Sequence, residues 1–180
     1  MSSRFALSFL GAFLATLFLL GAAGYAITRF SVREPREPYR AGSFEFDLEP
    51  GWQCEMDGTE IVCKPPGKAP RGAIAIIALK ERSGDDNLEL YEAHLRKPQR
   101  PNANQKLSRI RYVKRRLLGT KEWVESVHEG SELPNYITYY LATTTSLIGI
   151  LVTMSVHKDH EAEYVRQLDN MMSTLNVYQR

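Results

Sequence analysis

The only two cysteines of this 180-residue chain, Cys54 and Cys63, are the residues whose spacing best supports a defined chemistry. They lie in two short alternating runs, WQCEM and EIVCK, on either side of the turn-forming sequence DGT. If Gly58 and Thr59 form a two-residue turn, Cys54 falls opposite Cys63 in a β-hairpin, as a disulfide requires. If the turn begins one residue earlier, Cys54 falls opposite Ile61 and the pair fits a bridge poorly.

Cys54 and Cys63 are poor candidates for a metal centre, because a zinc site needs about four ligands and no second Cys or Cys/His cluster accompanies them. They also lack the CxxC spacing of a redox motif. The sequence therefore predicts a disulfide, with a reduced pair of buried cysteines and a redox pair as the alternatives. Since disulfides persist outside the reducing cytosol, the domain is expected to be extracytoplasmic. No cofactor is expected.

Two further groups carry side chains that could do chemistry. His157 and His160 lie three residues apart among charged neighbours, and we expect a solvated helix start there rather than a metal site. Ser126 and His128 could be a nucleophile and a base, but adjacent strand residues point to opposite faces, so we do not expect them to act together. The sequence contains no GxSxG, phosphate-binding glycine loop or HExxH. No enzymatic activity is predicted.

The amino terminus carries 24 residues without a charge, from Phe5 to Thr28. Such a run can cross a hydrocarbon core of about 30 Å as a helix, so residues 1–30 are predicted to be a signal anchor and transmembrane helix. Small residues between positions 22 and 26 keep a cleaved signal peptide as the alternative. Arginines after the run favour the opposite orientation. We give more weight to the cysteines, and predict a single-pass protein of the bacterial inner membrane with its carboxyl-terminal domain in the periplasm.

The remaining chain is divided into a tether at residues 31–41, with two prolines and alternating charge, and one domain at residues 42–180. Its alternating and amphipathic patterns predict an α+β fold, in which a twisted antiparallel sheet is packed with helices. The predicted strands are 43–48, the two arms of the cysteine hairpin, 72–80, 106–118, 120–129, 136–145 and 147–157, and the predicted helices run from Asn87 to before Pro98 and over 158–175.

This order of elements resembles the PsbP-like superfamily. The similarity rests on the segment FEFDLEPGW, on the pattern G-x-x-x-W at Gly119 to Trp123, on Y-x-T-Y-Y at Tyr136 to Tyr140, and on the closing segment MMSTLNV. It covers about residues 42–178 and consists of apolar positions rather than a chemical motif. The resemblance implies the fold of that superfamily and non-enzymatic roles in binding or assembly.

Basic residues are concentrated in one segment of the sequence. The segment from Arg96 to Lys121 contains ten basic residues and no acid, although residues 31–180 carry no net charge. Such segregation favours docking on an acidic protein or on anionic lipid headgroups; the alternative is a solvated face whose side chains pair with acidic neighbouring strands. Nucleic acid is not expected outside the cytoplasm. The predicted partner-binding residues are Arg96, Lys97, Arg100, Lys106, Arg109, Arg111, Lys114, Arg115 and Arg116.

Within this segment, a regular strand would place Ile110 and Tyr112 on one face and Arg109 and Arg111 on the other. If the first pair faces the core, the two arginines face water or a partner. The function predicted from sequence is therefore a membrane-anchored interaction or assembly module that binds through a basic face. The alternative is a hydrolase or metal-dependent enzyme of the cell envelope whose site is assembled from distant residues.

Overall fold

The computed structural model describes residues 16–22, 24–25, 36–42, 44–67, 72–100, 106–130 and 135–178. The chain forms two units, Met1–Pro35 and Arg36–Arg180. In the first, residues 16–22 and 24–25 are helical. No helix among the described residues is long and apolar enough to span a membrane. Most of the transmembrane helix predicted at residues 1–30 lies outside the described residues.

The second unit contains ten strands and two α-helices among its described residues. Its elements are β1 (Pro38–Ala41), β2 (Phe44–Asp47), β3 (Gln53–Asp57), β4 (Glu60–Lys64), β5 (Ala73–Glu81), α2 (Leu88–Leu95), β6 (Arg109–Leu118), β7 (Lys121–Glu129), β8 (Tyr136–Thr144), β9 (Ile148–His157), a short 3₁₀-helix (Lys158–His160), α3 (Glu161–Ser173) and β10 (Asn176–Val177).

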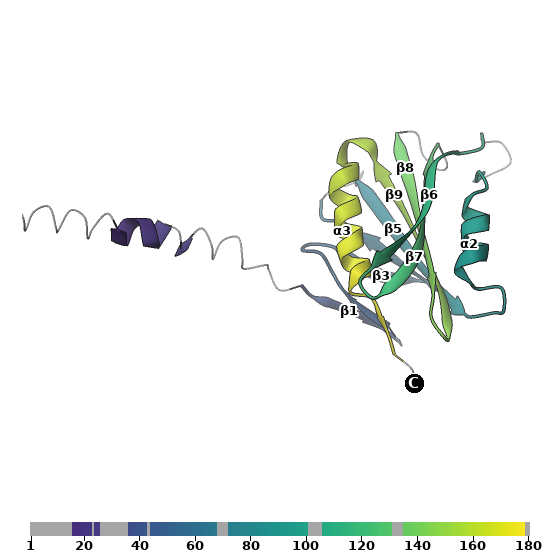
Figure 1. Ribbon diagram of the computed structural model, residues 1–180, viewed down its shortest axis with the longest axis horizontal. Helices are drawn as coiled ribbons and strands as arrows, with labels where there is room; N and C mark the ends of the chain where they lie inside the picture. The colour runs from purple at the N-terminus through teal and green to yellow at the C-terminus, as the bar shows by residue number, and fades with distance from the viewer. Residues whose placement is uncertain are drawn as a thin grey trace, which may run out of the picture. The chain divides into compact units, whose positions relative to one another are not determined.

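Seven strands form one antiparallel sheet in the order β3-β4-β5-β9-β8-β7-β6. Helix α3 packs on one face of this sheet and α2 packs on the other, so that the domain has three layers (Figure 1). The predicted α+β fold with an antiparallel sheet is confirmed. Helix α2 begins as its sequence predicts, because the Asn87 side chain caps it by accepting a hydrogen bond from the Leu90 N–H.

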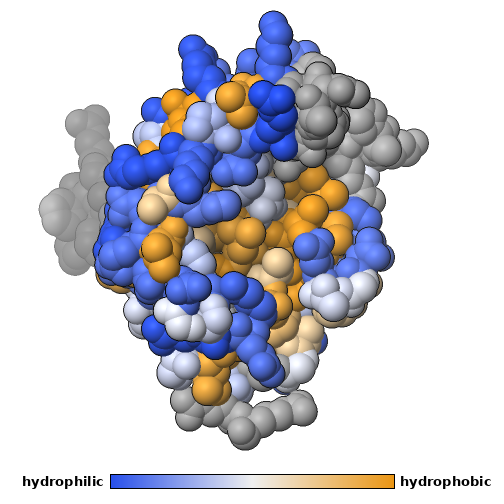
Figure 2. Space-filling model, turned by 90° about the vertical axis from the view of Figure 1, so that its right-hand side faces the viewer, coloured by the Kyte–Doolittle hydropathy of each residue, from blue (hydrophilic) through white to orange (hydrophobic). Residues whose placement is uncertain are grey.

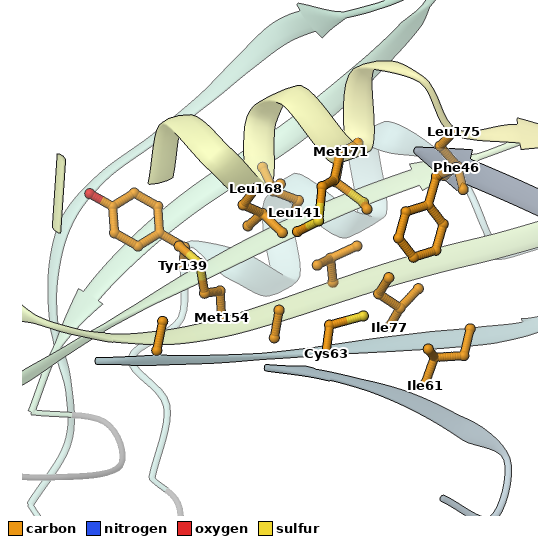
Figure 3. Close-up of a cluster of buried hydrophobic side chains, with 14 of the residues drawn as sticks. Phe46, Ile61, Cys63, Ile77, Tyr139, Leu141, Met154, Leu168, Met171 and Leu175 are labelled. Atoms are coloured by element: carbon orange, nitrogen blue, oxygen red, sulfur yellow. The ribbon is translucent and has the colours of Figure 1, made fainter. Parts of the chain in front are cut away.

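The main core lies between the sheet and α3. Leu168 and Met171 of α3 point down onto Leu141 and Met154 of the sheet, as Figure 3 shows. The alternation along the strands produces this layer, since every second residue from Ala73 to Ile77 on β5 and from Ile150 to Val156 on β9 faces α3 and is buried. Large apolar side chains buried in this way each contribute about 1.5–3 kcal/mol to folding.

A second, smaller sheet closes one end of the core in the order β1-β2-β10. Phe44 and Phe46 of β2 are buried in the main core, and β10 holds β2 from its other side. Strand β1 occupies Pro38–Ala41, within the range predicted to be a tether. Those residues are extended, but they pair with β2 instead of remaining unpaired, because the short turn after Ala41 folds them back onto it.

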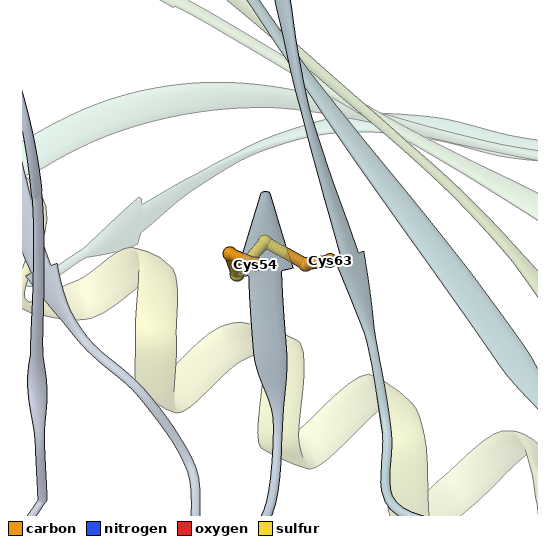
Figure 4. The surroundings of a disulfide bond; sticks show 2 residues. All are labelled: Cys54 and Cys63. Atoms are coloured by element: carbon orange, nitrogen blue, oxygen red, sulfur yellow. A yellow bond between two sulfur atoms is a disulfide. The ribbon is translucent and has the colours of Figure 1, made fainter. Parts of the chain in front are cut away.

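The cysteine hairpin has the predicted register. Gly58 has a φ of +62° at the first position of a two-residue turn, and Asp57 pairs with Glu60. Cys54 therefore lies opposite Cys63, and the two form a disulfide with a Cα–Cα distance of 4.1 Å (Figure 4). The Cys63 side chain is fully buried in the main core. The bridge joins edge strand β3 to β4, which is itself paired to β5.

Replacing both cysteines by serine should lower the free energy of unfolding by about 2–3 kcal/mol, because the bridge closes a short loop and reduces the entropy of the unfolded chain. Urea unfolding of the oxidised protein and of the variant would measure this difference. Mass analysis of exported protein without reductant should also give a mass two hydrogens below that of the reduced form. Two free thiols in natively exported protein would contradict the prediction.

Candidate binding cleft and the basic strand

The nine basic residues predicted to bind a partner lie at the carboxyl end of α2 and along β6. Arg96 follows the last residue of α2, Lys97 and Arg100 come next, and Lys106 precedes β6. The other five are in β6. Six of the nine form ion pairs with carboxylates of β7, α2 or α3: Arg96, Arg109, Arg111, Lys114, Arg115 and Arg116.

The prediction that Ile110 and Tyr112 share a face of β6 is wrong because the strand contains a β-bulge at Arg111, although Arg109 and Arg111 both reach Glu129. Ile110 lies opposite His128, but Tyr112 lies opposite Val127, so one extra residue is inserted between the two pairs. Ile110 therefore faces α2, whereas Tyr112 is on the α3 side of the sheet with Val127. Arg111 forms ion pairs with Glu129 of β7 and Glu161 of α3. From the sequence, it is predicted to face only water or a partner.

Glu125 is the centre of one ion cluster beneath α3. Its side chain is buried, and it accepts a hydrogen bond of 2.5 Å from the Tyr112 hydroxyl. Arg116 contacts Glu125 through Nε and forms a two-pronged pair with Asp169 of α3, at 2.7 Å and 2.5 Å. Lys114 lies 3.4 Å from Glu125. Burial and the Glu125 carboxylate raise the pKa of Tyr112, so its hydroxyl keeps its proton and donates.

Glu129 organises a second cluster at the other end of β6. Arg109 and Arg111 both donate to it, and this lowers the pKa of Glu129 to about 2. Arg111 also donates to Glu161 at the start of α3, and the Tyr139 hydroxyl donates a hydrogen bond to the same carboxylate. Together the two clusters tie β6 and β7 to α3. Most of the positive charge of β6 is therefore neutralised within the domain.

Arg115 points to the opposite face, where it joins β6 to α2. Its Nε lies 2.8 Å from Glu92, and its guanidinium also lies 3.2 Å from Glu89. Arg96 pairs with the same Glu92 carboxylate from within α2. Of the nine basic residues, Lys97 and Lys106 are exposed and form no ion pair with the described carboxylates, and Arg100 is exposed beside them.

Ser126 and His128 are brought together, contrary to the expectation from sequence. Residues two apart on a strand share a face, and the Ser126 Oγ lies 2.6 Å from His128 Nε2. The Ser108 Oγ lies 2.8 Å from the other ring nitrogen, Nδ1. All three side chains are buried, and the Leu95 carbonyl at the end of α2 accepts from Ser126. The group is closed to substrates and joins α2 to β6 and β7.

The hydrogen bonds around His128 fit a neutral ring. Ser108 accepts from the Gln99 N–H and donates to Nδ1, while Nε2–H donates toward Ser126 and the Leu95 carbonyl. A proton on Nδ1 would remove the acceptor that the Ser108 hydroxyl uses. Burial also disfavours the charged ring, and it lowers the pKa of His128 below its ordinary value.

Stability should therefore depend on the protonation of His128. The unfolded chain binds a proton below about pH 6.5 that the native ring resists, so the free energy of unfolding should fall as the pH drops below that value. Urea unfolding from about pH 8 to about pH 5 would measure the slope, and His128→Gln should be less stable overall but show a smaller slope. Equal slopes in the two proteins would contradict this assignment.

A cleft lies between α2 and the sheet, on the face opposite α3. It has a volume of about 740 Å³, and its floor is formed by Ala78 of β5, Tyr140 and Ala142 of β8, and Leu151 of β9. Leu90 of α2 forms part of the wall and remains 47% exposed. Figure 2 shows this side of the domain, with an apolar hollow bordered by polar side chains.

One end of the cleft is built around Asp86, at the amino end of α2. Its carboxylate accepts hydrogen bonds from Lys80, from the Ser83 N–H and from the Tyr91 hydroxyl, and these lower the pKa of Asp86 well below its usual range. Tyr91 can reach Asp86 because residue 149 is a glycine; a Cβ there would lie 2.5 Å from the Tyr91 oxygen. At this end of the cleft, Asp86 is therefore buried with hydrogen-bond partners and one ion-pair partner, Lys80.

Comparison with solved structures addresses the fold, since neither a protein-family model nor a curated protein matches the sequence. A Bacteroides thetaiotaomicron protein aligns with 81% of this chain at a TM-score of 0.59 and 14% identity, and this chain spans 49% of that protein's length. Cyanobacterial PsbP (CyanoP) from Synechocystis aligns with 82% of this chain and 95% of its own length, at a TM-score of 0.54 and 12% identity. The chain has a PsbP-like fold.

The PsbP-like domain brings no metal-binding group together among its described residues: no set of three or more His, Cys, Asp and Glu side chains is placed to hold an ion. His157 and His160 lie side by side, with ring centroids 6.3 Å apart, and the His157 ring accepts a hydrogen bond from the Asp159 N–H. His157 caps the 3₁₀-helix, whereas His160 is its last residue and directly precedes α3, so both lie where the sequence predicts a helix to start.

Sequence reasoning missed the cleft of the PsbP-like domain. Its floor combines β5 with the consecutive strands β8 and β9, which come much later in the chain, and its lining residues form no chemical motif. One signal was present on α2, where Leu90 is apolar but lies outside the face formed by Leu88, Tyr91 and Leu95. A second apolar position on a short amphipathic helix indicates that more than one face of the helix meets apolar surroundings.

Proposed function

We propose that this chain is a membrane-anchored, extracytoplasmic binding module without catalytic activity, and that its ligand binds in the cleft between α2 and the sheet. The observation that carries this proposal is the cleft itself, which leaves Leu90 and Leu151 exposed next to a packed core. A concave apolar site of several hundred Å³ with few polar groups is typical of ligand-binding sites.

The cellular location rests on two features. The Cys54–Cys63 disulfide supports an oxidising compartment, for which we propose the bacterial periplasm. The charge-free run from Phe5 to Thr28 supports an anchor in the inner membrane, with a cleaved signal peptide as the alternative. The residues of the run outside the described ranges contribute only their sequence to this argument.

A binding role without catalysis agrees with how the reactive side chains are used. Ser126 and His128 have no exposed surface and are hydrogen-bonded to the chain itself. Six of the nine basic residues also have acidic partners inside the domain. The docking role predicted for the basic segment is therefore proposed mainly for Lys97 and Lys106, which are exposed and form no ion pair with the described carboxylates.

The proposal can be tested in the full chain with a photo-crosslinking residue in place of Leu90. The chain should remain in the membrane fraction after a carbonate wash, and light should couple position 90 to a molecule of defined mass. The adduct should be lost when Leu151→Glu places a charge in the cleft. A crosslinker at Leu117, which is 70% exposed on β6 and outside the cleft, is the matched control.

No adduct at position 90, or the same adducts at positions 90 and 117, would show that the cleft is not the binding site. Loss of the chain from washed membranes would contradict the predicted anchor. It would not affect the test of the cleft, which depends only on the adducts at position 90. Thermal unfolding of the Leu151→Glu protein provides the necessary control for folding, since Leu151 is 40% exposed.

A further inference from the structure

The two ends of the cleft differ in charge. At the carboxyl end of α2, Lys97, Arg100 and Lys106 are all exposed, and we call these three residues the cationic rim. The described residues of this region, 96–100 and 106–108, include no acid. At the other end, Lys80 and Arg82 lie beside Asp85 and Asp86, with Lys80 paired to the Asp86 carboxylate and Arg82 bonded to the Asp86 carbonyl, so their charges balance. The anionic end of an elongated ligand is therefore favoured at the cationic rim, where the positive charge is not balanced by acids of residues 96–100 and 106–108.

The cationic rim is held at the cleft by backbone contacts. Gln99 lines the cleft, and its N–H and carbonyl both bond to Ser108, at 2.8 Å each. Arg100 follows Gln99 directly, and Lys106 precedes Ser108 by two residues, so this contact brings the two cations to the same end. The Gln99 side chain also donates to the Lys97 carbonyl at 3.0 Å.

The floor of the cleft favours a ligand that needs no hydrogen bonds. It is formed by β5, β8 and β9, and each of these strands is paired on both sides within the sheet. No strand edge is therefore available there for an extended peptide, whose backbone N–H and C=O groups would lose water without gaining partners. A hydrocarbon chain loses nothing of this kind and gains from leaving water.

We propose that the cleft binds one acyl chain of an anionic membrane phospholipid, with the phosphate against the cationic rim. This inference rests on the proposed function and names its ligand. The volume of about 740 Å³ lies within the range of about 300–1,000 Å³ usual for small-molecule sites. The proposed anchor would keep the domain close to a bilayer, so that lipid is present at high effective concentration.

The test uses the full chain, with a photo-crosslinking residue at position 90, in vesicles of phosphatidylcholine with a minor share of phosphatidylglycerol. Mass analysis of the adduct should show phosphatidylglycerol enriched several-fold over its share of the bilayer. The triple variant Lys97→Ser, Arg100→Ser, Lys106→Ser should abolish this enrichment, so that the adducts follow the bilayer composition, because each Lys or Arg near an anionic surface strengthens binding several-fold. High salt should reduce it as well.

Arg109→Ser is the matched control, because it removes an exposed positive charge on β6 that lies away from the cleft, and it should leave the adduct unchanged. Lipid adducts that only follow the bilayer composition, or that form equally at position 117, would overturn the inference. A protein adduct at position 90 in native membranes, without lipid, would also overturn it while supporting the cleft as a binding site. If position 90 gives no adduct in the vesicles or in native membranes, both this inference and the proposed function are contradicted.

Discussion

Replacing Gly119 by alanine should destabilise the domain by about 3 kcal/mol or more, because the new side chain would meet both backbone strain and a backbone overlap. Gly119 begins the two-residue turn between β6 and β7 and has a φ of +58°. A Cβ at this position would overlap the carbonyl oxygen of Ser173, the last residue of α3, and lie 2.9 Å from its carbonyl carbon. The end of α3 would have to move away from the hairpin.

Gly130→Ala is the control for this prediction. Gly130 has a similar φ of +69°, but a Cβ there meets nothing within 4 Å. It should therefore cost only the strain of the left-handed conformation, about 1–2 kcal/mol. Urea unfolding of both variants would separate the two causes. Equal losses would mean that the contact between Gly119 and α3 contributes nothing.

Arg116→Ala should cost about 2–4 kcal/mol, since it leaves two acids without their main partner. Glu125 is 2% exposed and would keep only Tyr112 and Lys114, while Asp169 of α3 would lose both of its hydrogen bonds. We place the value below that of a fully buried pair because the Arg116 side chain is 21% exposed. Urea unfolding of the variant measures the loss.

Arg109→Ser, the control for Arg116, removes a side chain that is 78% exposed and paired only with Glu129. Exposed pairs of this kind contribute at most about 1 kcal/mol. If the two variants were equally stable, the ion cluster beneath α3 would have no structural role, and the basic strand would again be the main candidate for partner binding.

Elements with strong local signals could be predicted from the sequence. The turn chemistry of Gly58 and Thr59 determines the hairpin register, and this register places the cysteines opposite each other. The amphipathic pattern of α3 likewise predicts that Leu168, Met171 and Met172 are buried. Both arguments need only contacts within a short segment, which is why they succeed.

Features that depend on distant segments could not be derived in this way. The bulge at Arg111 is invisible in sequence, and it reverses the faces of the residues that follow it. The acidic partners of β6 come from β7, α2 and α3, so the neutralisation of the basic segment appears only when these elements are assembled. The cleft has the same origin, since it needs β5, β8, β9 and α2 together.

The same bulge and charges bear on whether two copies of the domain can join through their sheets. Strand β6 is one edge of the seven-stranded sheet, and its ten residues are long enough to template a strand from another molecule. The bulge interrupts its flat hydrogen-bonding edge, and its long charged side chains, which are held in ion pairs within the domain, would have to lose water beside an added strand. The opposite edge, β3, has only five residues. The bulge and the charged side chains of β6 therefore disfavour edge-to-edge pairing of two domains, an effect that requires no partner.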